Sequence, residues 1–194
     1  YLKQGVDPGK FGPPRNPYTF GELPWMKPSA PIQRFTHMLA MVEGTALPVA
    51  RAGQMFWLDP IHSLVVASDR LALGSTFGTR DLGTVLTSGD DGFRPVYIAN
   101  APDGSLLIAD FYEHYIAHGQ HYQSQIDPTT GRIYRLRGAS SVLERDVNLS
   151  RKTPADWLAL LSHPNKWHRQ EAARLLAWRA TPESLEALRN RLEQ

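Results

Sequence analysis

The chain contains 194 residues, of which 42% are hydrophobic and 21% are charged, with a formal net charge of +2. These proportions are close to the averages of globular proteins and exclude both intrinsic disorder and a membrane class. The 21 basic residues are scattered among 19 acidic ones, so we expect no nucleic-acid partner, which would need clustered Lys and Arg. No apolar run approaches the roughly 20 residues that span a bilayer, and the absence of cysteine excludes disulfides and thiolate metal sites.

Residues 1–35 are rich in proline, with aromatic side chains interleaved. The prolines stand at positions 8, 13, 14, 17, 24, 28 and 31. Proline fixes φ and lacks the N–H that a β-ladder needs, so this segment is not expected to form a sheet core. The rings of Phe11, Tyr18 and Trp25 instead predict an irregular connection that packs on a larger body.

Residues 36–138 contain short apolar runs separated by turns, which is typical of antiparallel β-structure. Strands are expected at 36–44, 53–59, 62–69, 69–73, 84–89, 94–104, 105–112 and 131–138. The sequence Pro102-Asp103-Gly104 predicts a tight turn, because proline presets φ and glycine accepts a positive φ. Four-stranded units of roughly 40 to 50 residues are typical of propeller blades. We therefore predict the C-terminal blades of a β-propeller, with the last blade between Val85 and Leu136.

Beyond a linker at 139–152, the apolar period changes from two to about 3.6, which predicts helices. Helix starts are expected at Thr153–Pro154 and at Thr181–Pro182, where a threonine N-cap precedes a proline. Another helix is expected at 167–180. Two similar starts in a short tail indicate a HEAT-like helical repeat at 153–194. The predicted fold class is mainly β with a small α tail.

Side chains of the helical segment are expected to serve packing. Trp157, Trp167 and Trp178 stand at helical spacing and predict core contacts. His163 and His168 flank the second expected helix, and we interpret them as contacts between helices rather than as ligands.

Two stretches of the chain resemble a known family. They are TSGDDGFRPVYIANAPDGSLLIADFYEHYIAHGQHYQSQIDPTTGRIYRL (87–136) and LLSHPNKWHRQEAARLLA (160–177). The family is that of the large propeller dehydrogenase-like proteins abundant in planctomycetes, described as membrane-bound dehydrogenases or as haem-binding CxxCH proteins. The resemblance covers most of residues 36–180. It implies a propeller related to the soluble pyrroloquinoline-quinone glucose and sorbosone dehydrogenases, followed by HEAT-like helices and a cytochrome c domain.

The resemblance further implies that this chain is a fragment. The first blades are expected before Tyr1 and the cytochrome c domain after Gln194, so that haem c would belong to the intact protein. In the implied reaction, a sugar or polyol is oxidised at the quinone and electrons pass to the haem. The base in relatives comes from an earlier blade, so this chain alone is expected to be inactive. A periplasmic or secreted location also follows from the resemblance.

Arg94 and His62 are the candidates for binding the quinone. The quinone is a planar tricarboxylate, and its carboxylates require cationic partners such as the bidentate guanidinium of arginine. The segment FRPVYIANAPDG (93–104) resembles the quinoprotein segment whose arginine contacts the cofactor. The alternative is that Arg94 hydrogen-bonds loop carbonyls. The segment WLDPIHSLVVASD (57–69) resembles a quinoprotein segment in which a lysine points toward the cofactor. In this chain Ile61 or His62 stands at the position of that lysine, so the lysine is absent. His62 would face the central opening of the propeller, where the quinone is expected to bind. The alternative for His62 is a hydrogen-bonded structural role.

The stretch DFYEHYIAHGQHYQSQID (110–127) is the candidate metal site. His114 and His118 are four apart and would share a helix face, a spacing that binds transition metals through imidazole nitrogens. His118 and His121 also resemble a histidine pair of family relatives. Asp110, at a strand end, would either ligate calcium or cap a turn. The alternative for the whole loop is an interfacial cluster satisfied by backbone and water.

Two functions follow from these observations. In the first, the chain is part of an oxidoreductase-like propeller that uses a quinone. In the second, it is a non-catalytic propeller and HEAT binding module that recognises a glycan or a protein partner. The missing lysine favours the binding module, whereas the segment around Arg94 favours the enzyme.

Overall fold

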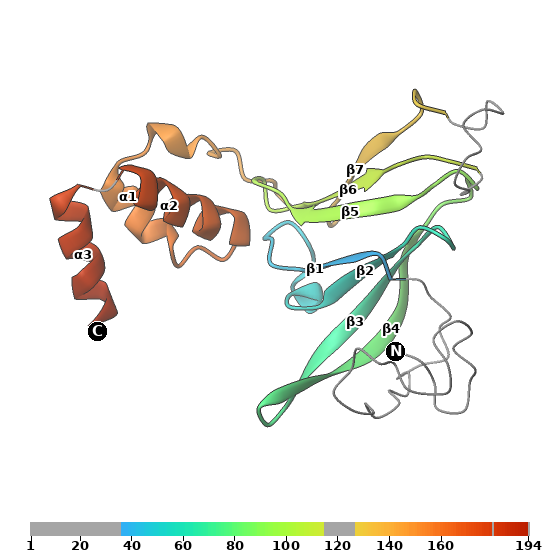
Figure 1. Ribbon diagram of the computed structural model, residues 1–194, viewed down its shortest axis with the longest axis horizontal. Coiled ribbons are helices and arrows are strands. Elements are labelled where there is room, and N and C mark those ends of the chain that lie inside the picture. Colours follow the sequence, from blue (N-terminus) through green and yellow to red (C-terminus); the bar gives the residue numbers. More distant parts are fainter. Residues whose placement is uncertain (1–35, 115–126, 180, 194) are drawn as a thin grey trace, which may run out of the picture. The chain divides into compact units, whose positions relative to one another are not determined.

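The computed structural model describes residues 36–114, 127–179 and 181–193. The chain divides into two compact units, 1–31 and 32–194, and all described residues belong to the second. The proline-rich connection predicted at 1–35 lies outside the described residues. In the described part, seven strands form two antiparallel sheets, and three α-helices follow toward the C-terminus (Figure 1). None of these helices is long and apolar enough to cross a bilayer.

The first sheet is a four-stranded antiparallel meander in the order β1-β2-β3-β4. Its strands are β1 (Met38–Met41), β2 (Met55–Asp59), β3 (Leu64–Leu73) and β4 (Thr76–Thr87). A short 3-10 helix, η2 (Val49–Arg51), lies between β1 and β2. The tight turn from β3 to β4 contains Gly74, whose φ of +60° suits glycine.

The second sheet has the order β5-β6-β7 and is also antiparallel. Its strands are β5 (Pro95–Asn100), β6 (Leu106–Asp110) and β7 (Arg132–Leu136). The predicted hairpin is confirmed: β5 pairs with β6 across a turn in which Gly104 has a φ of +86°. Asp103 stabilises this turn, because its Oδ1 accepts hydrogen bonds from the backbone N–H and the hydroxyl of Ser105.

Two strand predictions were wrong in their boundaries. Residues 62–69 and 69–73 were expected as separate strands, but β3 runs through Asp69 without a turn. Asp69 pairs across the hairpin with Arg80, at 2.6 Å, which keeps β3 and β4 together as one ribbon. Residues 84–89 were assigned to the blade between Val85 and Leu136, whereas Val85 belongs to β4 of the first sheet. In the described part, the second sheet therefore has three strands.

The hydrophobic core lies between the two sheets, where β1 and β2 contact β5. The residues of this core recur at every second position along β2, β3 and β6. The core consists of Val42, Leu47, Phe56, Leu58, Val65, Ala67, Ile98, Leu106 and Ile108. Asn100 also joins the sheets, because its side chain donates to the Met41 carbonyl at 2.9 Å and accepts the Glu43 N–H at 3.0 Å. Figure 1 shows the two sheets next to each other.

The predicted helices are confirmed as α1 (Pro154–Leu160), α2 (Lys166–Arg179) and α3 (Pro182–Leu192). A 3-10 helix, η4 (Leu149–Arg151), precedes them in the segment expected as a linker. Thr153 and Thr181 both form capping boxes, with Asp156 and Ser184 as their respective partners. These caps satisfy N–H groups that each helix would otherwise leave without acceptors.

A second core lies between η4, α1 and α2 and contains Leu149, Trp157, Ala172, Leu175 and Leu176. Trp157 is buried and donates from its indole N–H to the Leu149 carbonyl at 2.8 Å. Trp167 packs against this core. The prediction for Trp178 was wrong: it is 72% exposed, and Arg174 stacks on its ring at 4.4 Å. The predicted class, mainly β with a C-terminal α tail, is confirmed, and the two sheets do not close on themselves within the described residues.

Candidate functional site

Arg94, which immediately precedes β5, joins three loops at one end of the sheets. Its guanidinium donates to the Ser63 hydroxyl at 2.7 Å and to the Pro60 carbonyl at 3.2 Å. The same guanidinium reaches the His114 carbonyl at 3.2 Å. The residue is only 9% exposed. Arg94 therefore connects the β2–β3 turn, the start of β5 and the segment after β6, an arrangement that we call the Arg94 clasp.

Asp110 is the acidic partner in this clasp. Its Oδ1 accepts the backbone N–H groups of Arg94, at 2.8 Å, and of Tyr112, at 2.9 Å. Tyr112 has a φ of +48°, which is uncommon for a residue other than glycine and marks a sharp turn after β6. Asp110 thus caps a turn, one of the two roles expected for it from the sequence.

Asp59 organises the neighbouring turn between β2 and β3. It is 1% exposed, and its Oδ1 accepts the N–H groups of Ile61 and His62, both at 3.0 Å. Its Oδ2 lies 2.7 Å from Nδ1 of His62. The His62 side chain is 39% exposed. His62 therefore has the hydrogen-bonded structural role that was its alternative, while one side of its ring faces solvent.

The structure brings some of the predicted site residues together. Arg94 contacts Asp110 and the backbone of His114, and it reaches the turn that contains His62. The His114 ring does not face Arg94: its Nε2 lies 3.4 Å from the Tyr112 hydroxyl. The remaining candidate ligands, His118 and His121, lie outside the described residues.

The contacts of the Arg94 clasp limit how it could bind a carboxylate or a calcium ion. A guanidinium that binds carbonyls and a hydroxyl has few donors left for a bidentate contact with a carboxylate. Within the described part, Nε of Arg94 and Oδ2 of Asp110 are buried without a hydrogen-bond partner. The Pro60 and His114 carbonyl oxygens, which a calcium ion would seek, already bind a cation. Quinone and calcium binding at these residues stay predictions.

A second cluster, which we call the Glu144 cluster, contains Glu144, His163 and His168. Glu144 lies between β7 and η4, His163 lies in the turn between α1 and α2, and His168 is in α2. Oε2 of Glu144 lies 2.6 Å from Nε2 of His168 and 3.8 Å from Nε2 of His163. The two imidazole rings are tilted, with centroids 4.4 Å apart. His168 is 3% exposed.

Some polar atoms of the Glu144 cluster have hydrogen-bond partners and others do not. The Thr45 hydroxyl donates to Oε1 of Glu144, and the Asn165 N–H donates to Nδ1 of His163 at 3.1 Å. Despite the 2.6 Å separation, Nε2 of His168 and Oε2 of Glu144 are not aligned as a hydrogen bond, and Nδ1 of His168 has no partner either. A pocket of about 530 Å³ is lined by the cluster and by Thr45, Val142, Arg145, Asp146, Lys152, Leu160 and Pro164.

Polar contacts hold the helices against the loops of the sheets beside this cluster. Asn165 is fully buried, and its side-chain amide donates to the carbonyls of Ala101, at 3.2 Å, and Pro102, at 3.0 Å. Glu43 forms ion pairs with Lys166 and Arg169, each at 2.8 Å. The sequence interpretation of the two histidines as helix contacts missed Glu144, because a lone glutamate in a coil gives no spacing signal.

Residues 19–140 match the sequence profile of a domain of unknown function, DUF7133. The match covers more than half of the 194 residues. The chain belongs to the DUF7133 family. Both sheets and the Arg94 clasp lie inside the part that matches DUF7133, whereas Glu144, His163 and His168 lie beyond it. No curated protein and no solved structure matches the chain significantly.

Proposed function

We propose that this chain contributes a non-catalytic binding module to a larger protein, in which propeller blades carry a HEAT-like helical tail. Two consecutive antiparallel meanders with contacting first strands support the propeller assignment. Two capped helices that each begin with threonine and proline support the helical repeat. The DUF7133 match itself names no activity.

The observation that carries this proposal is the Arg94 clasp. The enzyme hypothesis requires Arg94 to present its guanidinium to a quinone carboxylate. Its two terminal nitrogens instead donate to Ser63 and to the carbonyls of Pro60 and His114. An arginine that joins three loops has a structural role, because losing it would leave the buried Pro60 carbonyl without this donor.

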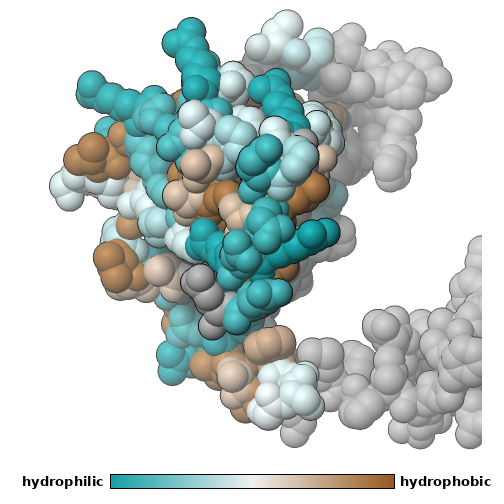
Figure 2. Space-filling model, turned by 90° about the vertical axis from the view of Figure 1, so that its left-hand side faces the viewer, coloured by the Kyte–Doolittle hydropathy of each residue, from teal (hydrophilic) through white to brown (hydrophobic). Residues whose placement is uncertain are grey.

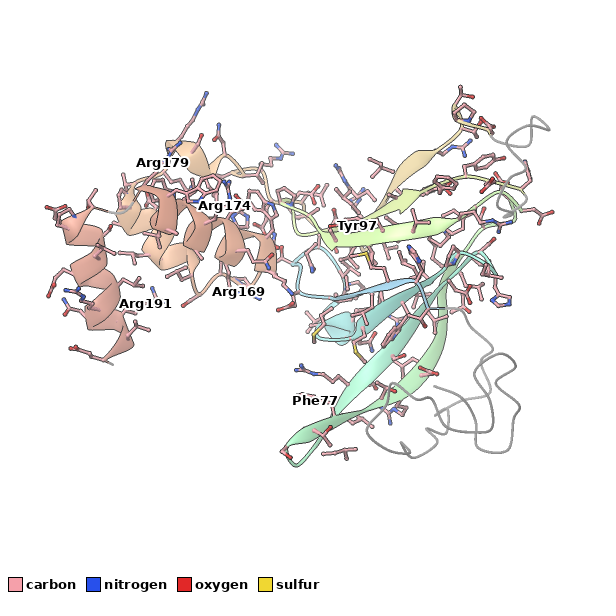
Figure 3. The ribbon with its side chains drawn as sticks, viewed as in Figure 1. Phe77, Tyr97, Arg169, Arg174, Arg179 and Arg191 are labelled. Atoms are coloured by element: carbon pink, nitrogen blue, oxygen red, sulfur yellow. The ribbon has the colours of Figure 1, made fainter. Side chains whose placement is uncertain are left out.

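A protein partner fits the helical surface. Trp178 is 72% exposed with Arg174 stacked on it, and Leu192 is 80% exposed on α3. Arg179 points away from α2 (Figure 3). Figure 2, which views the helical end, shows a largely hydrophilic face with separate apolar areas. Exposed tryptophan and arginine are the residue types most enriched at protein interfaces.

The proposal has two tests in the intact protein. After incubation with pyrroloquinoline quinone and calcium, the absorption spectrum is expected to show no bound quinone. A photoreactive residue at position 178 is expected to cross-link one partner polypeptide, whereas the same residue at Val49, which is 91% exposed, is not. Bound quinone, or equal cross-linking at both positions, would contradict the proposal.

The second candidate is a quinone-dependent oxidoreductase that oxidises a sugar or polyol and passes electrons to haem c, in the periplasm or outside the cell. The observation that favours it is the family resemblance around Arg94, together with the gathering of the Arg94 and His62 loops at one end of the sheets. This candidate predicts that quinone binds the intact protein and that Arg94→Lys abolishes the binding.

A further inference from the structure

We propose that Glu144, His163 and His168 form a binding site for a divalent transition metal ion such as Zn²⁺. These residues come from a coil, a turn and a helix, and their imidazole and carboxylate ligand atoms all lie within 4.8 Å of one another. Two imidazoles and one carboxylate are a donor set that zinc accepts, with water as a fourth ligand. The chain has no cysteine, so all ligands are nitrogen and oxygen.

The separations in the Glu144 cluster fit a shared ion. Ligand atoms about 2.1 Å from a tetrahedral zinc ion lie roughly 3.4 Å from one another. The two measured separations from Oε2 of Glu144, 2.6 Å to His168 and 3.8 Å to His163, lie on either side of this value. Side-chain shifts of less than about one ångström would make both distances equal to it.

His168 supplies the second argument. Its ring is buried, and Nε2 lies close to a carboxylate oxygen without being aligned to donate to it. A buried nitrogen without a hydrogen-bond partner costs about 1–3 kcal/mol of stability, so native proteins rarely retain one without a reason. An ion placed between Nε2 of His168 and Oε2 of Glu144 would give Nε2 a partner.

Hydrogen bonds hold Glu144 in an orientation that suits a metal ligand. The Thr45 hydroxyl donates to Oε1, and the Glu144 N–H donates to the Asp103 carbonyl at 3.0 Å. Hydrogen bonds of this kind orient a carboxylate ligand before the metal arrives. Lys152 also lines the pocket but pairs with Asp146, which reduces its repulsion of a cation. The pocket gives an ion and its water a path from solvent.

Metal binding has a specific consequence at His163. Because Nδ1 accepts the Asn165 N–H, a neutral His163 ring carries its proton on Nε2. An ion at Nε2 displaces this proton, and Nδ1 takes one up, so the ring stays neutral. The Asn165 N–H then loses its acceptor. Metal binding should therefore change the environment of the Asn165 amide.

The direct test is a titration of the 194-residue chain with Co²⁺, whose visible absorption reports tetrahedral coordination in place of zinc. The wild-type chain is expected to bind Co²⁺ and to release it when Zn²⁺ is added. Glu144→Gln and His163→Gln are expected to weaken binding more than about tenfold. His62→Gln, in which another histidine beside a carboxylate is removed, is the matched control and should bind as the wild type does.

A second control addresses the histidine-rich stretch at 110–127. The triple variant His114→Gln, His118→Gln, His121→Gln should bind Co²⁺ as the wild type does. The proposal is overturned if no visible spectrum develops at micromolar Co²⁺, or if binding is lost in the triple variant and retained in Glu144→Gln.

A measurement on the wild-type chain decides the matter if either cluster variant fails to fold. In amide NMR spectra, Zn²⁺ is expected to shift the Asn165 resonance and to leave the Ile61 and His62 amides, which donate to Asp59, unchanged. An unchanged Asn165 amide at saturating Zn²⁺ would overturn the site.

Discussion

A methyl group on Gly44 would lie 2.1 Å from the carbonyl oxygen of Gly104. The two backbones therefore touch at the point where the segment after β1 meets the β5–β6 turn. The same Gly104 oxygen accepts the Ala46 N–H at 2.9 Å, and Ala46 in turn accepts the Gly138 N–H at 2.8 Å. Three segments that are distant in sequence are joined at this point, and only glycine at position 44 permits the approach.

Gly44→Ala should destabilise the fold for this reason. The added methyl group meets backbone rather than a movable side chain, so the β5–β6 turn must shift at a cost of about 1–3 kcal/mol or more. Urea unfolding measures the effect. Gly89→Ala is the control, because nothing lies within 4 Å of its added carbon and its backbone is not in the left-handed region. Equal effects of the two substitutions would contradict this account.

Asn165→Ala should weaken the attachment of the helices. The substitution leaves the Ala101 and Pro102 carbonyls without their donor in a buried place, which costs about 1–3 kcal/mol. Hydrogen exchange should rise in α2 before it rises in the β5–β6 hairpin. Gln170→Ala, an exposed change in the same helix, should leave both the stability and the exchange unchanged.

Asp127 should titrate at unusually low pH. The hydroxyl of Thr130, followed by the amide and hydroxyl of Thr129, holds the pKa of Asp127 at about 2, below its ordinary value of 3.8. Because the folded pKa is lowered, its contribution to stability is complete above pH 3.8 and is lost as the pH falls toward about 2. Carboxyl NMR titration checks this value. Thr130→Val should raise the Asp127 pKa, and an unchanged titration would refute the role of the Thr130 hydroxyl.

Thr153→Ala should destabilise α1. The threonine hydroxyl accepts the Asp156 N–H, and the Asp156 carboxylate accepts the Thr153 N–H at 2.8 Å, so the substitution removes one half of a capping box. The expected cost is about 1 kcal/mol. Circular dichroism during thermal unfolding measures it, and Ser150→Ala, outside the capping box, is the control.

Features that depend on neighbouring residues were predictable from the sequence. The threonine–proline starts of α1 and α3 and the turn at Pro102–Gly104 are local, because each cap or turn is complete within a few residues. The part of β4 before Thr84 was missed because most of its residues are exposed, so that no regular apolar alternation marks it. Its signal was the Gly74 turn.

Features that depend on distant contacts were not predictable. Whether Arg94 faces a cofactor or loop carbonyls depends on where Pro60 and His114 lie, and the sequence left both alternatives open. The Glu144 cluster forms only when α2 lies against the sheet loops. Trp178 has the spacing of a core residue, but its exposure depends on what packs beside α2.

The stability of Arg94→Lys tests the central claim, that Arg94 joins loops. Lysine keeps the positive charge but cannot reach Pro60, Ser63 and His114 together. The account predicts that urea unfolding shows a loss of about 2–3 kcal/mol, because the buried Pro60 carbonyl loses a charged donor and two further loop contacts are broken. A variant within about 0.5 kcal/mol of the wild type would contradict the clasp and return Arg94 to a role in binding.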